Sequence, residues 1–315
     1  MRAWRKAGAS LTWNTAGQFS AAFFGLLLVK VSVSAFTPSA YGFAALVLGI
    51  QLLLRNVGML PPLNLAIYGS ASEGAQHGLG HLYALGQRAL LAVAVIGLVL
   101  APLLLRGVAG AATDLPVYAA LISALLASEA LKSLRFNLLH CRGLARRYAL
   151  WFAGDAAMKP LVVVLAWRLS PVPDSTLLLV AAQVVGSLLS LGASYLDPRI
   201  LSLSRERLDA APLPRLADWL RSHRGFLTPL IGVGLTGWIT GLSDRYLVNH
   251  FLGAGPAGLY AGVYGLFSAP FLIGGGAVLL TARPALLRLQ AEGRIGELRA
   301  LHRRVLVLMA LGAAG

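Results

Sequence analysis

The sequence predicts an all-α polytopic membrane protein, and three observations support this fold class. The chain of 315 residues is 57% hydrophobic and 12% charged, whereas charged residues make up about a quarter of an ordinary soluble domain. Apolar runs of the length that a bilayer requires, about 20 residues, recur along the whole chain. The basic residues that give the formal net charge of +15 lie mostly in short loops, which indicates a sided membrane topology and argues against nucleic-acid binding.

The apolar runs predict helices that cross the bilayer one after another. The expected spans cover residues 10–35, 41–69, 84–105, 115–139, 147–169, 176–196, 225–252 and 257–281. A ninth run begins near residue 301 and reaches Gly315 after about fifteen residues, which is shorter than a span. We therefore expect the chain to be a truncated form, or a fragment of a longer reading frame.

The loop charges predict the orientation of these spans. With the N-terminus in the cytoplasm, the outside loops carry only Arg106 and Arg168, and the remaining basic loop residues lie inside. An excess of Arg and Lys marks cytoplasmic loops. The N-terminus is therefore expected on the cytoplasmic side.

The longest polar interval divides the chain into two bundles. Residues 197–224 carry six arginines and are expected to form a basic cytoplasmic linker. Residues 1–196 are expected to form a complete N-terminal lobe of six helices, and residues 225–315 a partial C-terminal lobe of about three. The turns at 36–42 and 253–260 echo each other, because each places Pro before Tyr or Gly at the start of a helix. Internal repeats of this kind are common in transporters.

Six of the basic residues inside the apolar spans are the candidate binding residues of the chain. A charge at membrane depth costs about 2.5–3.5 kcal/mol on insertion scales, so it usually faces a protein interior or a wet cavity. Several such cations with few anions between them predict a site for a negatively charged ligand. The six residues are Arg55, Lys159, Arg135, Lys132, Lys30 and Arg245.

Spacing along each helix predicts partners for some of these cations. Glu129 precedes Lys132 by three residues, and Asp155 precedes Lys159 by four, which is the favourable acid-before-base order. Each acid–base pair has two interpretations: an ion pair within its own helix that supports folding, or a set of side chains that line the cavity. Arg135 has no partner in its own helix and is near enough to the cytoplasmic end to reach the interface.

The other cations keep two readings each. Arg55 lies in the middle of its span, one turn after Gln51, and is too deep to reach either interface, so it either binds a ligand or belongs to a buried structural ion pair. Lys30 lies near the outer end of the first span and can line the cavity or reach the outer interface. Asp244 beside Arg245 can form a gate between the lobes, or belong to a polar stripe that packs helices.

Two further polar residues share a face of the first span. Asn14 and Gln18 are four residues apart on its inner half. They can bind sugar hydroxyls or hydrogen-bond to neighbouring helices.

Motifs for catalysis and for metal binding are absent from the sequence. There is no phosphate-binding loop and no arrangement that would serve as a catalytic triad. Cys141 is the only cysteine, and His77 and His81 are expected to be loop residues without a third ligand. We therefore expect no enzyme activity, no metal and no cofactor, with H⁺ or Na⁺ left open as a coupling ion.

The two turn segments resemble those of a known transporter family. The runs SAFTPSAYGFAALVLGIQLLLRNVGMLPPLN and SDRYLVNHFLGAGPAGLYAGVYGLFSAP are similar to the first outer turn and the start of the C-terminal lobe in polysaccharide (Wzx-type) flippases. These belong to the multidrug/oligosaccharidyl-lipid/polysaccharide (MOP) exporter superfamily. The resemblance implies a two-lobed helical transporter bundle around a central cavity.

The resemblance also implies a function and a location. Members move undecaprenyl-diphosphate-linked oligosaccharides across the bacterial inner (plasma) membrane by alternating access, for surface polysaccharide or lipopolysaccharide biosynthesis. Expected partners are the anionic lipid-linked oligosaccharide, membrane lipids and other polysaccharide-assembly proteins, and not nucleic acid.

Three alternative functions stay open at this point. A peptidoglycan-precursor flippase needs a similar cationic cavity. A multidrug exporter of the same superfamily would be expected to present carboxylates to cationic drugs. A membrane-bound glycosyltransferase or polymerase would need larger outer loops than those expected here.

Overall fold

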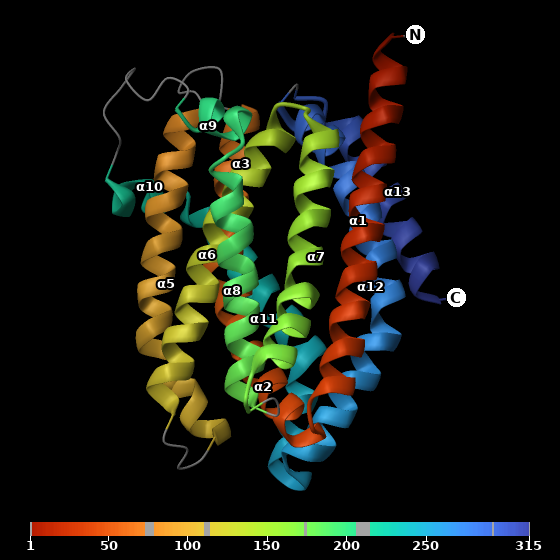
Figure 1. Ribbon diagram of the computed structural model, residues 1–315. Helices are drawn as coiled ribbons and strands as arrows, with labels where there is room; N and C mark the ends of the chain where they lie inside the picture. The colour runs from red at the N-terminus through yellow and green to blue at the C-terminus, as the bar shows by residue number, and fades with distance from the viewer. Residues whose placement is uncertain are drawn as a thin grey trace.

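The structure is a computed structural model. It describes residues 2–72, 79–109, 114–172, 175–205, 215–291 and 293–314. Every secondary-structure element in these residues is a helix. The long helices run up and down the molecule as one bundle (Figure 1). The elements in chain order are α1 (Arg2–Ala35), α2 (Pro38–Leu54), the π-helix η1 (Arg55–Met59), α3 (Leu60–Ser72), α5 (Leu79–Ala109), α6 (Leu115–Cys141), α7 (Ala145–Leu169), α8 (Thr176–Ser194), α9 (Pro198–Ser204), α10 (Leu216–Ser222), α11 (Arg224–Leu252), α12 (Ala254–Ala291) and α13 (Ile295–Ala314).

The helices confirm the predicted fold class. Seven of those that the structure describes are long and apolar enough to cross a membrane, at Thr12–Ala35, Pro38–Ile67, Tyr83–Gly107, Leu115–His140, Ala145–Leu169, Thr176–Ser194 and Arg224–Leu252. These match the first seven spans expected from the sequence, and the eighth lies within α12. The protein is therefore a multi-pass membrane protein.

Local sequence explains where several helices begin and end. At the start of α2, the Thr37 side chain accepts a hydrogen bond from the Ala40 backbone N–H, and Pro38 occupies the first turn, where its missing N–H is harmless. Gly143 ends the turn after α6, and Gly253 separates α11 from α12. Both have positive φ, which glycine adopts without strain.

The first six spans form the N-terminal part of the bundle. Helix α1 packs mainly on α7, α5 packs on α6, and α8 packs on both α6 and α7. The largest buried cluster joins α2, α5, α6, α7 and α8, and includes Val47, Ile122 and Val163. This packing holds α6 and α7 side by side, which brings their charged residues together.

The two turn segments that echo each other in sequence lie against each other in space. A Cβ added to Gly42 would lie 1.9 Å from the Ala254 carbonyl oxygen, and one added to Gly258 would lie 2.0 Å from the Pro38 carbonyl oxygen. The contact is reciprocal, because Pro38 and Ala254 are the first residues of α2 and α12, and Gly42 and Gly258 each lie four residues further along. Helix α2 therefore meets α12 at a crossing that only glycine permits.

Two hydrogen bonds continue this junction along α11. The Tyr246 hydroxyl donates to the Leu46 carbonyl at 2.8 Å, and the Trp238 Nε1 donates to the Gly49 carbonyl at 2.7 Å. Helix α11 is thus fixed to α2 by side chains that reach backbone atoms.

One of the two histidines that were expected in a loop lies in a helix. His81 lies within α5 and not in a loop, whereas His77 lies outside the described residues. The division into lobes at 1–196 and 225–315 stays a prediction, and the described part of the interval 197–224 contains α9 and α10.

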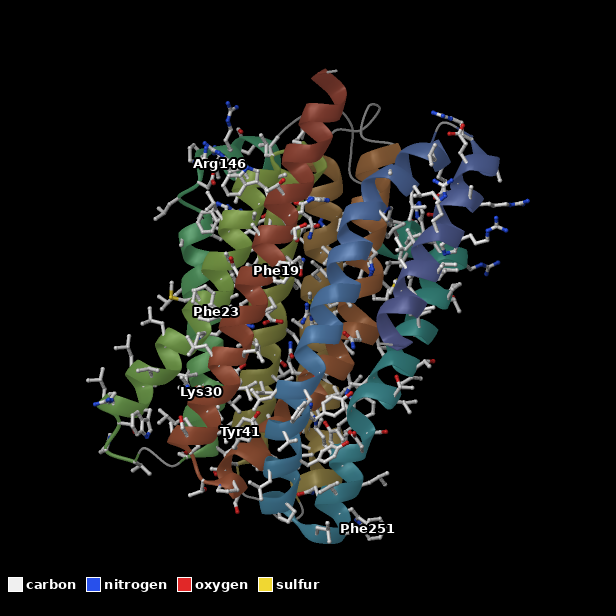
Figure 2. The ribbon with its side chains drawn as sticks, turned by 90° about the vertical axis from the view of Figure 1, so that its right-hand side faces the viewer. Phe19, Phe23, Lys30, Tyr41, Arg146 and Phe251 are labelled. Carbon is white, nitrogen blue, oxygen red and sulfur yellow. The ribbon has the colours of Figure 1, made fainter. Side chains whose placement is uncertain are left out.

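Several helices turn large apolar side chains outward. Phe19 and Phe23 on α1 are 58% and 62% exposed, and Phe251 near the end of α11 is 76% exposed. Figure 2 shows them on the outside of the bundle. Exposed apolar side chains of this size are expected where helices face lipid.

Candidate functional site

Two cavities meet in the middle of the bundle. The inner cavity, on the side expected to face the cytoplasm, has a volume of about 300 Å³, and the outer cavity has about 230 Å³. Both are lined by Leu28, Arg55, Glu129 and Lys159. These shared residues therefore form the boundary between the two cavities.

Different helices supply the rest of each lining. The inner cavity lies between α1, α6 and α7, and its other residues are Ala21, Gly25, Lys132, Ser133, Phe136, Asn137, Tyr148, Phe152, Asp155 and Ala156. The outer cavity lies between α1, α2, α8 and α11, and its polar residues include Ser32, Tyr41, Gln51, Gln183 and Arg245.

Arg55 occupies an irregular position in its helix. It is the first residue of η1, the π-helix that joins α2 to α3. Such single-turn π segments in α-helices frequently occur at functional sites. The Arg55 side chain is 36% exposed and opens into both cavities. Its Nη1 lies 3.8 Å from Glu129 Oε2, while its Nε is buried without a hydrogen-bond partner.

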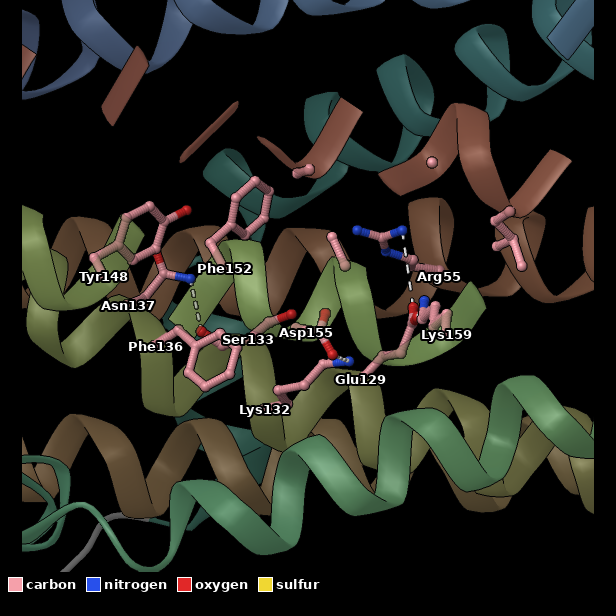
Figure 3. A pocket seen from close by; sticks show the side chains of 14 residues that line it. Arg55, Glu129, Lys132, Ser133, Phe136, Asn137, Tyr148, Phe152, Asp155 and Lys159 are labelled. Atoms are coloured by element: carbon pink, nitrogen blue, oxygen red, sulfur yellow. Dashed lines mark hydrogen bonds and ion pairs between the residues drawn. The ribbon is translucent and has the colours of Figure 1, made fainter. Parts of the chain in front are cut away.

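The ion pairs differ from those that the spacing predicts. Lys159 Nζ lies 2.5 Å from Glu129 Oε1, and Lys132 Nζ lies 2.5 Å from Asp155 Oδ1 (Figure 3). The predicted pairs, Glu129 with Lys132 and Asp155 with Lys159, each lie within one helix. The observed pairs cross between α6 and α7, because the two helices face each other at this depth.

Hydrogen bonds hold one carboxylate and one lysine of the two pairs in place. Gln51 Nε2 donates to Glu129 Oε2 at 3.4 Å, and Lys132 Nζ donates to Ser187 Oγ at 3.1 Å. Lys132 is thereby drawn toward α8 and is almost fully buried. Arg55 and Lys159, with side chains 36% and 22% exposed, are the more accessible cations of the inner cavity.

Arg135 differs from the expectation for a residue near the cytoplasmic entrance. It is 1% exposed and is not among the lining residues of either cavity. Its Nε and Nη2 donate to Ser194 Oγ and to the Ser194 carbonyl, at 2.8 Å and 2.9 Å, and its Nη1 donates to the Tyr83 hydroxyl at 3.1 Å. The guanidinium also stacks over the Tyr195 ring. Arg135 therefore joins α6 to α5 and α8, and it is held within the protein.

Three other candidates on α1 lie apart from the two cavities. Lys30 is exposed on the outer surface of the helix (Figure 2). Asn14 is buried and its Oδ1 has no hydrogen-bond partner, and Gln18 is half-buried. None of the three belongs to the lining of the inner or the outer cavity.

Asp244 and Arg245 take different partners. Asp244 accepts hydrogen bonds from the Tyr260 hydroxyl and from the backbone N–H of Arg245. The Arg245 guanidinium lies over the Tyr264 ring, 5.4 Å from its centroid, and lines the outer cavity. In the described part of the chain, no side-chain ion pair joins these two residues, so Arg245 remains available to a ligand.

Sequence reasoning missed several lining residues. Tyr148 and Phe152 precede Asp155 and Lys159 at spacings of three or four residues, so all four lie on one face of α7. This helical period is the signal that could have found the two aromatic residues. Gln183 on α8 has no such signal, because its helix carries no charge near it.

The described residues do not suggest a metal centre. No group of three His, Cys, Asp or Glu side chains among them is placed to hold a metal ion. The arrangement instead offers fixed positive charges beside aromatic and hydroxyl groups, which suits an anionic ligand with polar substituents.

Comparison with known proteins identifies the fold. No protein-family model and no curated protein matches the sequence. Two solved structures match over almost the entire chain. One, described as MATE in complex with MaD3S, has 16% identity and a TM-score of 0.56 over 97% of this chain and 79% of its own. The other is a MOP superfamily transporter from Pyrococcus furiosus, described as having a binding pocket of reverse polarity that suggests a different function. It has 15% identity and a TM-score of 0.55 over 95% of this chain and 67% of its own. The protein thus has the fold of MOP superfamily transporters.

Proposed function

We propose that the protein is a membrane exporter whose cavity binds an anionic substrate. One observation carries this proposal: the inner cavity is lined by three cations and only two carboxylates, and a lysine engages each carboxylate. The excess charge lies on Arg55, which is the most exposed cation of the cavity and has a buried Nε without a partner. An anion is the ligand that completes this arrangement.

The substrate that we propose is an undecaprenyl-diphosphate-linked oligosaccharide. Its diphosphate carries about two negative charges, and the guanidinium of Arg55 can donate two parallel hydrogen bonds to phosphate oxygens. Tyr148, Phe152 and Asn137 line the same cavity and offer stacking and hydrogen-bonding surfaces to a sugar. The prenyl tail needs no protein site, since it can stay in the lipid.

This substrate implies the setting that the sequence predicts. The chain would act in the bacterial inner membrane with its N-terminus in the cytoplasm, together with proteins of polysaccharide or lipopolysaccharide assembly. A peptidoglycan-precursor flippase would present the same diphosphate chemistry to Arg55, so the cavity favours the two lipid-linked substrates equally.

A multidrug exporter is the second candidate. Its support is the fold match to a MATE protein and the presence of Glu129 and Asp155 in the cavity. A cationic drug, however, would have to displace Lys159 or Lys132 from its carboxylate. That displacement leaves a buried lysine unpaired, at a cost of several kcal/mol.

A binding assay separates these candidates. Purified protein in detergent is titrated with farnesyl diphosphate and, separately, with ethidium, and binding is followed by tryptophan fluorescence. We expect wild-type protein to bind the diphosphate, and Arg55→Ala to weaken this binding by about tenfold or more, as loss of a hydrogen bond to a charged group supports. Lys30→Ala, which removes a cation outside both cavities, should leave it unchanged.

Two outcomes would contradict the proposal. Ethidium binding without diphosphate binding would favour the multidrug exporter. Equal losses with Lys30→Ala and Arg55→Ala would show that overall charge, and not the cavity, attracts the anion. Arg55→Lys separates charge from geometry, because lysine keeps the charge but lacks the paired donors.

A further inference from the structure

The outer cavity is lined by two arginines that come from different helices. Arg55 enters from η1, and Arg245 enters from α11. The Nε atoms of both are buried, and neither has a hydrogen-bond partner. A buried donor without a partner costs about 1–3 kcal/mol, and more when it is charged. Both guanidinium groups also line the cavity, so N–H groups that face it can donate to a ligand there.

The charge of this cavity is more positive than that of the inner one. Its ionised lining residues are Arg55, Lys159 and Arg245 against Glu129 alone, which leaves a net charge of +2. Glu129 is already engaged by Lys159 at 2.5 Å. Asp244, the carboxylate next to Arg245 in sequence, is turned to the Tyr260 hydroxyl. Among the described residues, no carboxylate forms an ion pair with the Arg245 side chain.

The remaining polar lining is neutral and comes from three helices. Ser32 lies on α1, Tyr41 and Gln51 on α2, and Gln183 on α8. Their hydroxyl and amide groups can donate hydrogen bonds to anionic oxygens without adding negative charge. The aromatic ring of Tyr264 supports the Arg245 guanidinium from the side of α12.

The two arginines lie on η1 and α11, and α11 packs directly against η1 and α2. Helix α11 already contacts α2 through hydrogen bonds from Tyr246 and Trp238 to backbone carbonyls. Gly234 of α11 also lies against η1, where an added Cβ would be 2.3 Å from the Asn56 carbonyl oxygen. A ligand held by Arg55 and Arg245 would add a charged link across the same junction.

We propose that the outer cavity is a second anion subsite, in which Arg55 and Arg245 clamp one diphosphate group between the N-terminal helices and α11. The ligand class is a diphosphate, whose charge of about −2 balances the cavity. This inference rests on the proposed function, since it assigns a second station on the path of the same anionic substrate. Binding there fixes α11 against η1.

A double-mutant cycle tests the clamp. Binding of sodium pyrophosphate and of farnesyl diphosphate is measured by isothermal titration calorimetry for wild type, Arg55→Gln, Arg245→Gln and the double variant. Lys30→Gln serves as the matched control. We expect each single variant in the cavity to weaken binding about tenfold or more. The double variant should be weakened less than the product of the two losses, because both arginines hold one ligand.

The two probes distinguish the source of the diphosphate. Binding of both shows that the cavity recognises the diphosphate itself, whereas binding of farnesyl diphosphate alone shows that the clamp requires a lipid ester. Both results support the clamp if the arginines are coupled. A double variant whose loss equals the product of the single losses would overturn it.

Failure of this inference is distinguishable from failure of the proposed function. Wild-type affinity in Arg245→Gln, with a loss in Arg55→Gln, would overturn the clamp and leave the cationic inner cavity intact. Wild-type affinity in both variants would overturn both.

A second measurement covers misfolding of the Arg245 variant. Hydrogen exchange of the wild-type protein is compared with and without pyrophosphate over residues 243–249 of α11. We expect slower exchange when the anion is bound, because the clamp restrains this helix. Unchanged exchange at saturating pyrophosphate would also overturn the clamp.

Discussion

The two ion pairs that cross between α6 and α7 yield a quantitative prediction. In Lys132→Met, Asp155 loses a lysine whose Nζ lies 2.5 Å from its Oδ1, and Ser187 loses the same donor. Lys132 and Asp155 have side chains that are 3% and 15% exposed, so water replaces the lost partner poorly. Breaking a buried ion pair from one side costs about 3–5 kcal/mol. We expect Asp155→Asn to cost a similar amount from the other side.

The coupling between the two changes is the sharper quantity. In the double variant neither charge is left alone, so about 2 kcal/mol or more of the summed loss should be recovered. The pair Glu129–Lys159 should behave in the same way. The pairs within one helix, Glu129–Lys132 and Asp155–Lys159, should show less than half of that coupling, because each lysine is bound elsewhere.

The assay is the free energy of unfolding in bicelles, measured by steric trapping for wild type, the four single variants and the four double variants. Lys30→Met is the control and should stay within about 0.5 kcal/mol of wild type, because Lys30 is exposed. Larger coupling within the helices than between them would refute the crossed pairing. Zero coupling in all four cycles would refute the ion pairs altogether.

Three further predictions concern the scaffold. Gly42→Ala should destabilise the protein by about 1–3 kcal/mol and lower its melting temperature, because the added Cβ would lie 1.9 Å from a carbonyl oxygen. Gly154→Ala is the control and should leave the melting temperature unchanged, because the added Cβ would have nothing within 4 Å. Burial raises the pKa of Asp197, but the hydrogen bond from Trp151, the backbone N–H groups of α9 and a nearby arginine lower it below its usual value. The ionised Asp197 carboxylate therefore adds to the free energy of unfolding fully above about pH 4, and this contribution is lost as the pH falls through the lowered pKa. The melting temperatures of wild type and Asp197→Asn should differ at pH 7 and converge in stronger acid. Arg135→Lys should lower the melting temperature, because a lysine cannot reproduce the three hydrogen bonds of Arg135. Diphosphate affinity should stay unchanged, because Arg135 lies outside both cavities. A loss of affinity without a loss of stability would contradict this placement.

Much of the fold could be predicted because the apolar period and the loop punctuation are local properties. The seven spans described by the structure fall where apolar runs of sufficient length occur. The turns before α2 and α12 were identified as related, and they meet in space through Gly42 and Gly258. The sequence could not show that they touch, because similarity between two segments carries no information about their distance.

The candidate site was predicted in composition more than in arrangement. Arg55, Lys132 and Lys159 line the inner cavity together with Glu129 and Asp155. Arg135, by contrast, was expected near an entrance and is enclosed by α5 and α8. A charge at membrane depth indicates that a residue faces the protein, and it does not indicate whether that interior is a cavity or a hydrogen-bonded core.

The sequence by itself determined the class of protein and the order of its spans, because these follow from the free energy of placing apolar and polar groups in a bilayer. The tertiary structure alone decided which charges pair. A lysine side chain reaches a carboxylate on the neighbouring helix as easily as one on its own next turn, and the packing of α6 against α7 selects the neighbour. The tertiary structure also places Arg55 of η1 and Arg245 of α11 in the lining of one cavity, which no spacing within one helix could reveal.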